Sequence, residues 1–143
     1  MNIERARPDD FSAVRTLLER NSLPSDDLTP RSLELFRVAR DATGVVGAVG
    51  LERHGNYALL RSLVVDAEHR DRGLGSQLVA SAEALATQLG LRTIYLLTTT
   101  AADFFAARGF RAVPRDSTPD EIKRTSEFAS LCPSTAVVMT KEV

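Results

Sequence analysis

The sequence holds very little cysteine, and this scarcity excludes several classes of protein. Cys132 is the single cysteine of the chain, so neither a disulfide within the chain nor a zinc site built from several cysteines can form. The two histidines, His54 and His69, are not spaced as metal ligands, and no HExxH motif is present. We therefore expect no metal.

An excess of one charge and a long apolar run are missing as well. The 18 basic residues nearly balance the 19 acidic ones, for a formal net charge of −1. Nucleic acid is therefore not expected as the main partner, since that binding needs a basic patch against phosphate. No apolar run approaches the roughly 20 residues that cross a bilayer, and the chain does not begin with the apolar segment of a signal peptide. We expect a cytoplasmic protein without membrane contact.

What the sequence does contain is typical of one folded domain. Hydrophobic residues make up 43% of the chain and charged residues 26%, both ordinary shares for a globular protein. The length of 143 residues fits one domain. We expect a single domain over residues 1–143 that folds without a disulfide or a metal.

The apolar pattern predicts a mixed sheet with helices on both faces. Strands are predicted at 3–6, 33–38, 45–52, 57–65, 91–99, 110–113 and 134–140, and helices at 8–18, 73–89, 101–108 and 120–131. Residues 32–35 could also be helical. The early strands are joined by short turns and must be antiparallel, whereas the long helix at 73–89 makes a crossover. The fold class is therefore α/β (mixed α+β), with a sheet of six or seven strands.

The most informative segment lies between a predicted strand and the long helix. It begins with Leu63-Val64-Val65 and continues through Arg70 and Arg72 to two glycines, Gly73 and Gly75. The first N–H groups of a helix point outward without an internal partner, and the helix dipole adds positive charge there. Glycines let a phosphate approach this end, and the arginines can add charge-assisted bonds. The segment predicts an anion site, with a purely conformational turn as the alternative.

Two familiar nucleotide motifs are excluded, although another nucleotide or phosphate ligand stays open. No Gly-Lys-Ser/Thr of a Walker loop follows, and the third glycine of a dinucleotide fingerprint is missing. Instead, Arg70-x-x-Gly73-x-Gly75 after Leu63-Val64-Val65 resembles the acetyl-CoA motif of the GNAT N-acetyltransferases. The segment 102–110 is similar to that family's helix before the sixth strand, which usually ends in Tyr-x-x-x-Gly-Phe. The resemblance covers essentially the whole chain and implies a V-shaped splay between the fourth and fifth strands.

The same resemblance implies which residues hold acetyl-CoA as co-substrate. The strand Leu63, Val64 and Val65 would bind the pantetheine arm through the backbone. The pyrophosphate would lie on the amides of Arg70, Asp71, Arg72, Gly73, Leu74, Gly75 and Ser76. Phe105 would lie beside the cofactor at the position where the family often has a tyrosine, its general acid. Because a phenyl ring cannot donate a proton, either another group does so or the thiolate leaves unaided, which its pKa near 8.5 allows.

A narrower resemblance concerns the acceptor. Residues 98–105 and 127–133 look like the GNAT proteins of bacterial arsenic-resistance operons, some relatives of which acetylate amino-acid-like antimetabolites. Residues 130–133 are also similar to stretches in amino-acid N-acetyltransferases. This resemblance implies a small-molecule amine as acceptor and a link to arsenic resistance, and it leaves a homodimer open. A single thiol cannot hold arsenic(III) strongly, so simple sequestration is rejected.

Attack of an amine on a thioester needs a group that takes the amine's proton. Glu52, at the end of the third strand, is the first candidate for this base and His54 the second. The alternatives are a solvated strand-end role for Glu52, a turn-residue role for His54, and an enzyme that works by positioning alone. Cys132 is a candidate proton donor to CoA or a contact at the substrate pocket, with a buried apolar role as its alternative.

The acceptor site is expected on two strands. Arg61 and Ser62 lie in the groove-lining strand, and because neighbours point to opposite faces, at most one of them faces the groove. A buried arginine needs an acid, which is either an anionic group of the substrate or a structural salt bridge. Thr98 and Thr99 end the fifth strand, where the acyl group would enter; capping of the strand end is the alternative.

The function that these residues imply is an acetyl-CoA-dependent N-acetyltransferase for a small amine, an amino acid or an amino-acid-like toxin. The alternative is a non-catalytic acyl-CoA-binding regulatory module on the same fold.

Overall fold

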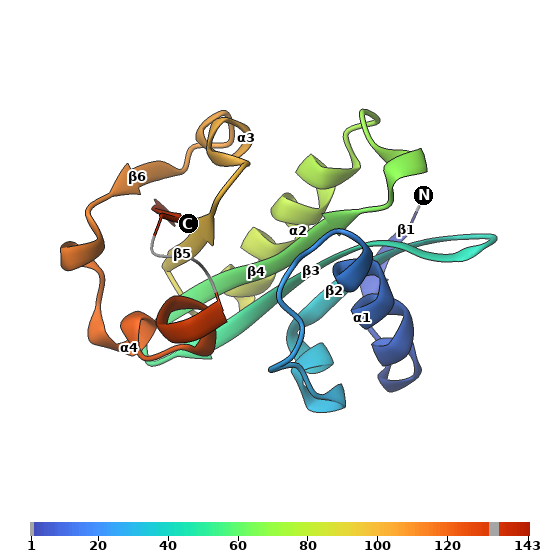
Figure 1. Cartoon of the computed structure of the whole chain (residues 1–143), viewed down its shortest axis with the longest axis horizontal. Coiled ribbons are helices and arrows are strands. Elements are labelled where there is room, and N and C mark those ends of the chain that lie inside the picture. The colour runs from blue at the N-terminus through green and yellow to red at the C-terminus, as the bar shows by residue number, and fades with distance from the viewer. Residues whose placement is uncertain (1, 132–134) are drawn as a thin grey trace. The chain divides into compact units, whose positions relative to one another are not determined.

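The computed structural model describes residues 2–131 and 135–143, and its strands form one mixed sheet (Figure 1). The strands are β1 (Asn2–Arg5), β2 (Phe36–Asp41), β3 (Gly44–His54), β4 (Tyr57–Val65), β5 (Thr93–Thr98), β6 (Arg111–Val113) and β7 (Val137–Glu142). The α-helices are α1 (Phe11–Arg20), α2 (Leu74–Gln88), α3 (Ala102–Ala106) and α4 (Asp120–Lys123). The strand order is β1-β2-β3-β4-β5-β7-β6, which confirms the predicted mixed α/β class.

The chain divides into two compact units. One consists of Met1–Glu52 and Leu60–Leu85, and the other of Arg53–Leu59 and Ala86–Val143. The long strands β3 and β4 therefore each contribute residues to both units.

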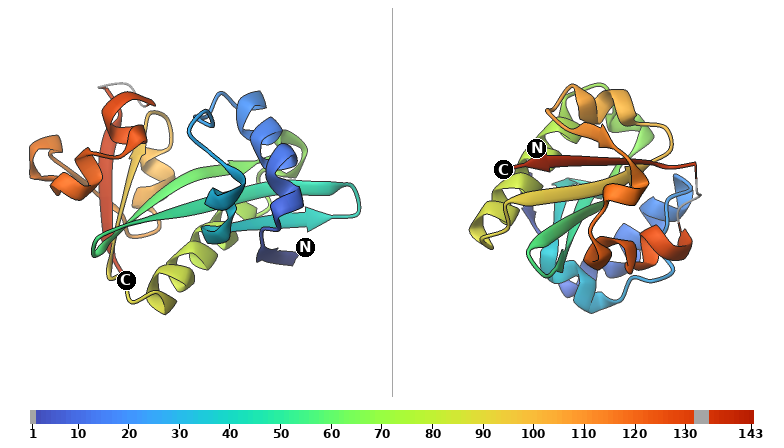
Figure 2. Two further views of the ribbon diagram at one scale, coloured as in Figure 1. Left: turned by 90° about the horizontal axis from the view of Figure 1, so that it is seen from below. Right: turned by 90° about the vertical axis from the view of Figure 1, so that its left-hand side faces the viewer.

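In the first unit, helices cover both faces of the strands. β1, β2 and β3 are antiparallel neighbours, so successive residues of β3 point to opposite sides. Ala48 belongs to a core that includes Val14 and Leu18 of α1. A Cβ on its neighbour Gly47 would lie 3.1 Å from the side chain of Leu78 in α2. The left-hand view of Figure 2 accordingly shows α1 and α2 on opposite sides of these strands.

The second unit contains the parallel strand pair. Tyr57–Leu59 of β4 lie parallel to Thr93–Tyr95 of β5, and β5 continues antiparallel to β7, which pairs with β6. The parallel register covers three residue pairs at the beginnings of β4 and β5, as expected from a crossover through α2.

Two segments differ from the sequence prediction. The strand predicted at 33–38 begins only at Phe36, because Pro30–Leu35 form a 3₁₀ helix. Pro30 has the fixed φ that suits a first helical position, and the amide of Thr29 donates to Ser32 Oγ at 3.1 Å. Residues 32–35 are therefore helical, which is the alternative that the sequence left open beside a strand.

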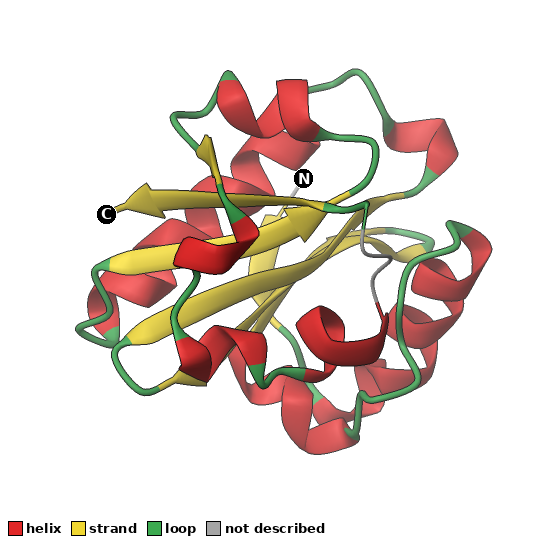
Figure 3. Cartoon of the chain, turned by 60° about the vertical axis from the view of Figure 1, so that its left-hand side comes forward, coloured by secondary structure: helices red, strands yellow, loops and turns green. Residues whose placement is uncertain are grey.

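The helix predicted at 120–131 is interrupted. α4 ends at Lys123, and a π-helical turn follows at Glu127–Leu131 (α4 in Figure 1; helices are red in Figure 3). The hydroxyl of Thr125 donates to the Ile122 carbonyl at 2.8 Å and accepts from the Phe128 amide. Such a hydroxyl competes with the regular backbone bonds of a helix. Within the described residues, no helix is both long and apolar enough to span a bilayer.

Candidate functional site

The glycine loop has the backbone shape of an anion site. Asp71 and Gly73 both have positive φ, +64° and +77°, and loops that combine such residues turn successive N–H groups into a concave nest. A Cβ built on Gly73 meets nothing within 4 Å, so the space beside it is open. α2 then begins at Leu74 and carries no acidic residue in its first turn. The positive end of its dipole is thus available to an anion.

Arg70 anchors this loop rather than only extending from it. Its Nε donates to the Val65 carbonyl at 3.1 Å, and its Nη2 donates to the side-chain oxygen of Asn21, which follows α1. The side chains of the strand before the loop differ in role: Val64 is buried in the core, whereas Leu63 and Val65 are partly exposed. Leu74 is buried too, so only its backbone could serve the predicted pyrophosphate site.

His69 connects the start of the loop to the turn after β2. Its Nε2 lies 2.9 Å from Oδ2 of Asp41, and its Nδ1 lies 3.6 Å from Oδ2 of Asp66. The Asp41 carboxylate also accepts from the hydroxyl and the amide of Thr43. These two bonds, with a smaller contribution from His69, hold the pKa of Asp41 below its usual value.

Arg61, Glu52 and Asp27 form one ion-pair network in the first unit. The fully buried Arg61 side chain donates through Nη1 to Asp27 Oδ2 at 2.5 Å and to Glu52 Oε2 at 2.7 Å. Its Nη2 donates to Asp27 Oδ1 and to the Pro24 carbonyl, and its Nε donates to Ser62 Oγ. These five bonds match the five N–H groups of an arginine.

This geometry bears on two of the sequence predictions. Protein groups engage the guanidinium of Arg61, which is the structural salt bridge that the sequence left open beside a role in substrate binding. The expectation that Arg61 and Ser62 point to opposite faces is wrong, since their side chains are hydrogen-bonded at 3.0 Å. Ser62 has a φ of +60°, which breaks the alternation of a regular strand.

The remaining predicted residues lie elsewhere. Thr98 Oγ1 accepts from the Ala101 amide at 3.0 Å, as strand-end capping requires, and Thr99 is exposed. Phe105 is 5% exposed and packs edge-to-face with Phe104 and Phe110. Cys132 lies outside the described residues.

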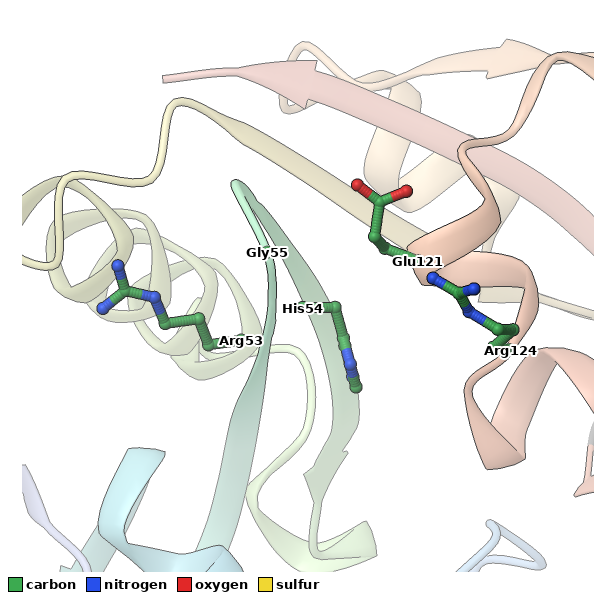
Figure 4. Close-up of a pocket in the computed structure, with 5 residues that line it drawn as sticks. All are labelled: Arg53, His54, Gly55, Glu121 and Arg124. Atoms are coloured by element: carbon green, nitrogen blue, oxygen red, sulfur yellow. The ribbon is translucent and has the colours of Figure 1, made fainter.

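His54, the second candidate base, lies in the second unit. It lines a pocket of about 330 Å³ together with Arg53, Gly55, Glu121 and Arg124. Figure 4 shows the Arg53 side chain pointing away from Glu121 and Arg124, so the two guanidinium groups do not converge. Among the described residues, no group of three or more His, Cys, Asp or Glu side chains could hold a metal ion.

Sequence reasoning missed Asp27, Asp41 and Asn21. Asp27 lies in a loop without a motif, 34 positions from Arg61, and Asp41 is 28 positions from His69. The only available signal for Asp27 was indirect: a buried arginine requires an acid, and a nearby loop holds two aspartates.

Comparison with known proteins identifies the family of this chain. The model of the family described as "Acetyltransferase (GNAT) domain" matches residues 32–112. An amino-acid acetyltransferase of Pseudomonas putida (strain GB-1) is 32% identical over 88 residues, which are 60% of this chain and 20% of that protein. The amino-acid acetyltransferase of Azotobacter vinelandii is 42% identical over 52 residues, 36% of this chain and 12% of that one. The chain thus spans about a fifth or less of the length of these curated relatives.

Solved structures share the fold over nearly the whole chain. N-acetylglutamate synthase from Neisseria gonorrhoeae, complexed with coenzyme A and N-acetyl-glutamate, has a TM-score of 0.85 at 19% identity, covering 99% of this chain and 34% of that one. Rv2747 from Mycobacterium tuberculosis, in complex with CoA and NLQ, has a TM-score of 0.83 at 21% identity, covering 100% and 99%. The expected GNAT-type fold is confirmed.

Proposed function

This chain belongs to the GNAT acetyltransferase domain family, and from that membership we propose that it is an acetyl-CoA-dependent N-acetyltransferase acting on the amino group of a small, amino-acid-like molecule. The observation that carries the proposal is the open, positive-φ glycine loop at the beginning of α2. The names of the amino-acid acetyltransferase relatives support the acceptor class. An amino-acid-like toxin as acceptor and a link to arsenic resistance rest on the sequence resemblance alone. A cytoplasmic location and a homodimer likewise stay predictions.

The cofactor site would be built mainly from backbone groups. The amides of residues 70–76 would bind the pyrophosphate of acetyl-CoA, and the backbone of Leu63 and Val65 would bind its pantetheine arm. When bound, acetyl-CoA supplies the thioester. Since amides do not titrate, this part of the site would work unchanged over a wide pH range.

In the proposed reaction, the acceptor amine loses a proton to Glu52 and attacks the thioester carbonyl. A carbon–nitrogen bond forms, the carbon–sulfur bond breaks, and the CoA sulfur leaves as a thiolate. Phe105 has no proton to offer that thiolate. Cys132 remains the candidate donor, with unaided departure as the alternative, which the pKa of a thiol permits.

A non-catalytic acyl-CoA-binding module is the second candidate function, and one observation favours it. Glu52 is paired with Arg61 at 2.7 Å, and an opposite charge at that distance makes a carboxylate a weaker base. Such a module would bind acetyl-CoA and leave every amine unmodified.

The deciding experiment follows thiol release from acetyl-CoA with amino acids and with phosphinate and arsenical analogues, together with calorimetric binding of CoA and ATP. Gly73→Glu places a negative charge at the predicted pyrophosphate site and should weaken CoA binding at least about tenfold. Gly90→Glu is the matched control, because Gly90 lies beyond the other end of α2 with a φ of +75° and equally open space. Equal CoA affinity of the two folded variants would overturn the site. Thiol release with an amine decides for the enzyme, and CoA binding without any release decides for the module.

A further inference from the structure

Two carboxylates share one nitrogen of Arg61, and they differ in exposure. Asp27 and Glu52 both accept from Nη1, at 2.5 and 2.7 Å. The Arg61 side chain is 0% exposed, that of Asp27 19% and that of Glu52 27%. Glu52 is therefore the carboxylate of the two that an incoming molecule reaches more easily, while Asp27 also accepts from Nη2 of the guanidinium. We propose that Asp27 is a positioning residue for Glu52 and acts through the Arg61 guanidinium. This proposal rests on the proposed function, in which Glu52 takes the proton of the acceptor amine.

The first step of the argument is geometric. Asp27 binds the guanidinium as a fork, with Oδ2 on Nη1 and Oδ1 on Nη2. A bidentate pair of this kind fixes the plane of the guanidinium. The direction of the remaining Nη1–H bond is then fixed as well, and that bond is the one Glu52 accepts. Through this bond Asp27 contributes to the position of the Glu52 carboxylate.

The second step is electrostatic. A base that is paired with a full positive charge has little tendency to take a proton. Here the single positive charge of Arg61 is divided between two carboxylates, so the cluster of the three side chains carries a net charge of −1. The negative charge of Asp27 offsets the effect of Arg61 on Glu52 and favours transfer of a proton to Glu52. Removing the charge of Asp27 removes this offset, so the positive charge of Arg61 acts more strongly on Glu52.

The third step concerns the backbone that carries Asp27. The same guanidinium donates to the Pro24 carbonyl at 3.4 Å, so Arg61 ties the segment between α1 and Pro30 to β4. If Asp27 had a purely structural role, as a clamp between this segment and β4, it would make the same contacts. The two roles of Asp27 predict different effects. In a structural role, Asp27 affects the stability of the protein whatever residue stands at position 52. As a positioning residue, it affects turnover only through Glu52.

The test is a double-mutant cycle on the full chain, with the acceptor that gives the fastest thiol release. Asp27→Asn keeps the size and one acceptor oxygen and removes the charge. We expect kcat to fall about tenfold, which corresponds to roughly 1.4 kcal/mol, with the KM for acetyl-CoA unchanged. The acid-side midpoint of the kcat/KM profile should move to lower pH. In the Glu52→Gln background, the same substitution should cause no further loss of kcat, because the two residues act as one unit. Asp26→Asn, at the exposed neighbouring acid, is the matched control and should leave both constants unchanged.

The outcomes separate the two proposals. Two outcomes overturn the role of Asp27 and leave the enzyme assignment intact. The first is that the kcat losses of the two single variants multiply in the double variant. The second is that Asp27→Asn has an unchanged kcat and a lower melting temperature. Absence of thiol release by the wild-type chain with every amine overturns the proposed function, and this inference with it. If Asp27→Asn does not fold, Asp27→Glu takes its place. This variant keeps the charge, so its acid-side midpoint should match the wild type, and a shifted midpoint overturns the proposal.

Discussion

Nε2 of His69 lies 2.9 Å from Oδ2 of Asp41, and this contact joins the turn between β2 and β3 to the segment that leads into the glycine loop. Neither residue belongs to the predicted pyrophosphate site, which begins at Arg70. A loop that is held in its binding shape loses less conformational entropy when a ligand binds. The contact should therefore contribute to cofactor affinity and not to the chemical step.

We expect Asp41→Asn and His69→Ala each to raise the KM for acetyl-CoA about threefold to tenfold, or roughly 0.7–1.4 kcal/mol, with kcat unchanged. Steady-state kinetics at a saturating amine concentration would measure both constants. Glu68→Gln, at an exposed acid of the same segment, is the control and should behave as wild type. A fall in kcat with a constant KM would contradict this role.

Asp71 occupies an unfavourable backbone conformation inside a predicted anion site. Its φ is +64°, a region that Asn and Asp tolerate better than most residues, and its negative charge repels a pyrophosphate. Asp71→Asn keeps a residue type that tolerates positive φ and removes the negative charge. We expect the Kd for CoA to fall about threefold at low ionic strength, and the gain to shrink as salt is added.

Calorimetric titration with CoA at two salt concentrations would measure this effect. Asp71→Ala also removes the charge but lacks the tolerance for positive φ, so it should lower the free energy of unfolding by about 1–2 kcal/mol. Weaker CoA binding by the folded Asp71→Asn variant would show that the carboxylate itself takes part in binding.

A buried acid on the first unit gives a dependence of stability on pH. Burial opposes the charge of Asp10, but two hydrogen bonds from Arg40 and one from the Arg7 amide outweigh it and hold the pKa of Asp10 below its usual value. Because the pKa is lower in the folded than in the unfolded state, this contribution to stability is complete above about pH 4 and is lost as the pH falls through the folded-state value.

We expect Asp10→Asn to lower the free energy of unfolding at pH 7 by about 2 kcal/mol, the contribution of hydrogen bonds to a charged group. Its stability should also decline less steeply than that of the wild type below pH 4. Urea unfolding at neutral and acid pH would measure both effects. Asp9→Asn changes the exposed neighbour and should alter neither the stability at pH 7 nor its decline in acid. If the stability of wild type and of Asp10→Asn declined equally steeply below pH 4, the role of Asp10 would be contradicted.

Features that depend on neighbouring residues could be predicted from the sequence. The strand predicted at 57–65 has those bounds as β4, since a mainly apolar segment between turn residues indicates a buried strand. Gly90 closes α2 with a φ of +75°, the conformation of a helix C-terminal glycine. The glycine loop was predicted for the same reason, because its glycines and its helix are adjacent in the chain.

Features that depend on distant residues could not be predicted. The sequence indicates that a buried Arg61 needs an acid, but it does not indicate that Asp27 supplies one, because loop residues have no periodicity that fixes their direction. The left-handed φ of Ser62 has no local signal either, since serine is not a residue that favours it. The sequence left open whether the acid that pairs with Arg61 is an anionic group of the substrate or a residue of the protein, and the structure shows Asp27 and Glu52 paired with it.

Arg61 is therefore the residue at which the sequence-based and the structure-based readings differ most. Protein groups accept from all five N–H donors of the Arg61 guanidinium. Arg61→Ala removes these bonds together with the positive charge between two carboxylates. Breaking a buried ion pair on one side costs about 3–5 kcal/mol, so we expect a corresponding fall in the free energy of unfolding. Arg61→Lys restores the charge without the fork and should recover only part of it.

The kinetic readout separates this role from recognition of an anionic substrate. If Arg61 served an acidic group of the acceptor, a folded Arg61→Lys variant would show a selective rise in the KM for anionic acceptors, because an ammonium cannot make the bidentate pair. We expect instead that the KM values for anionic and neutral acceptors change by the same factor. Arg53→Lys, at an exposed arginine of β3, is the control for the substitution. A rise of thirtyfold or more confined to anionic acceptors, about 2 kcal/mol, with an unchanged melting temperature, would return Arg61 to the acceptor site.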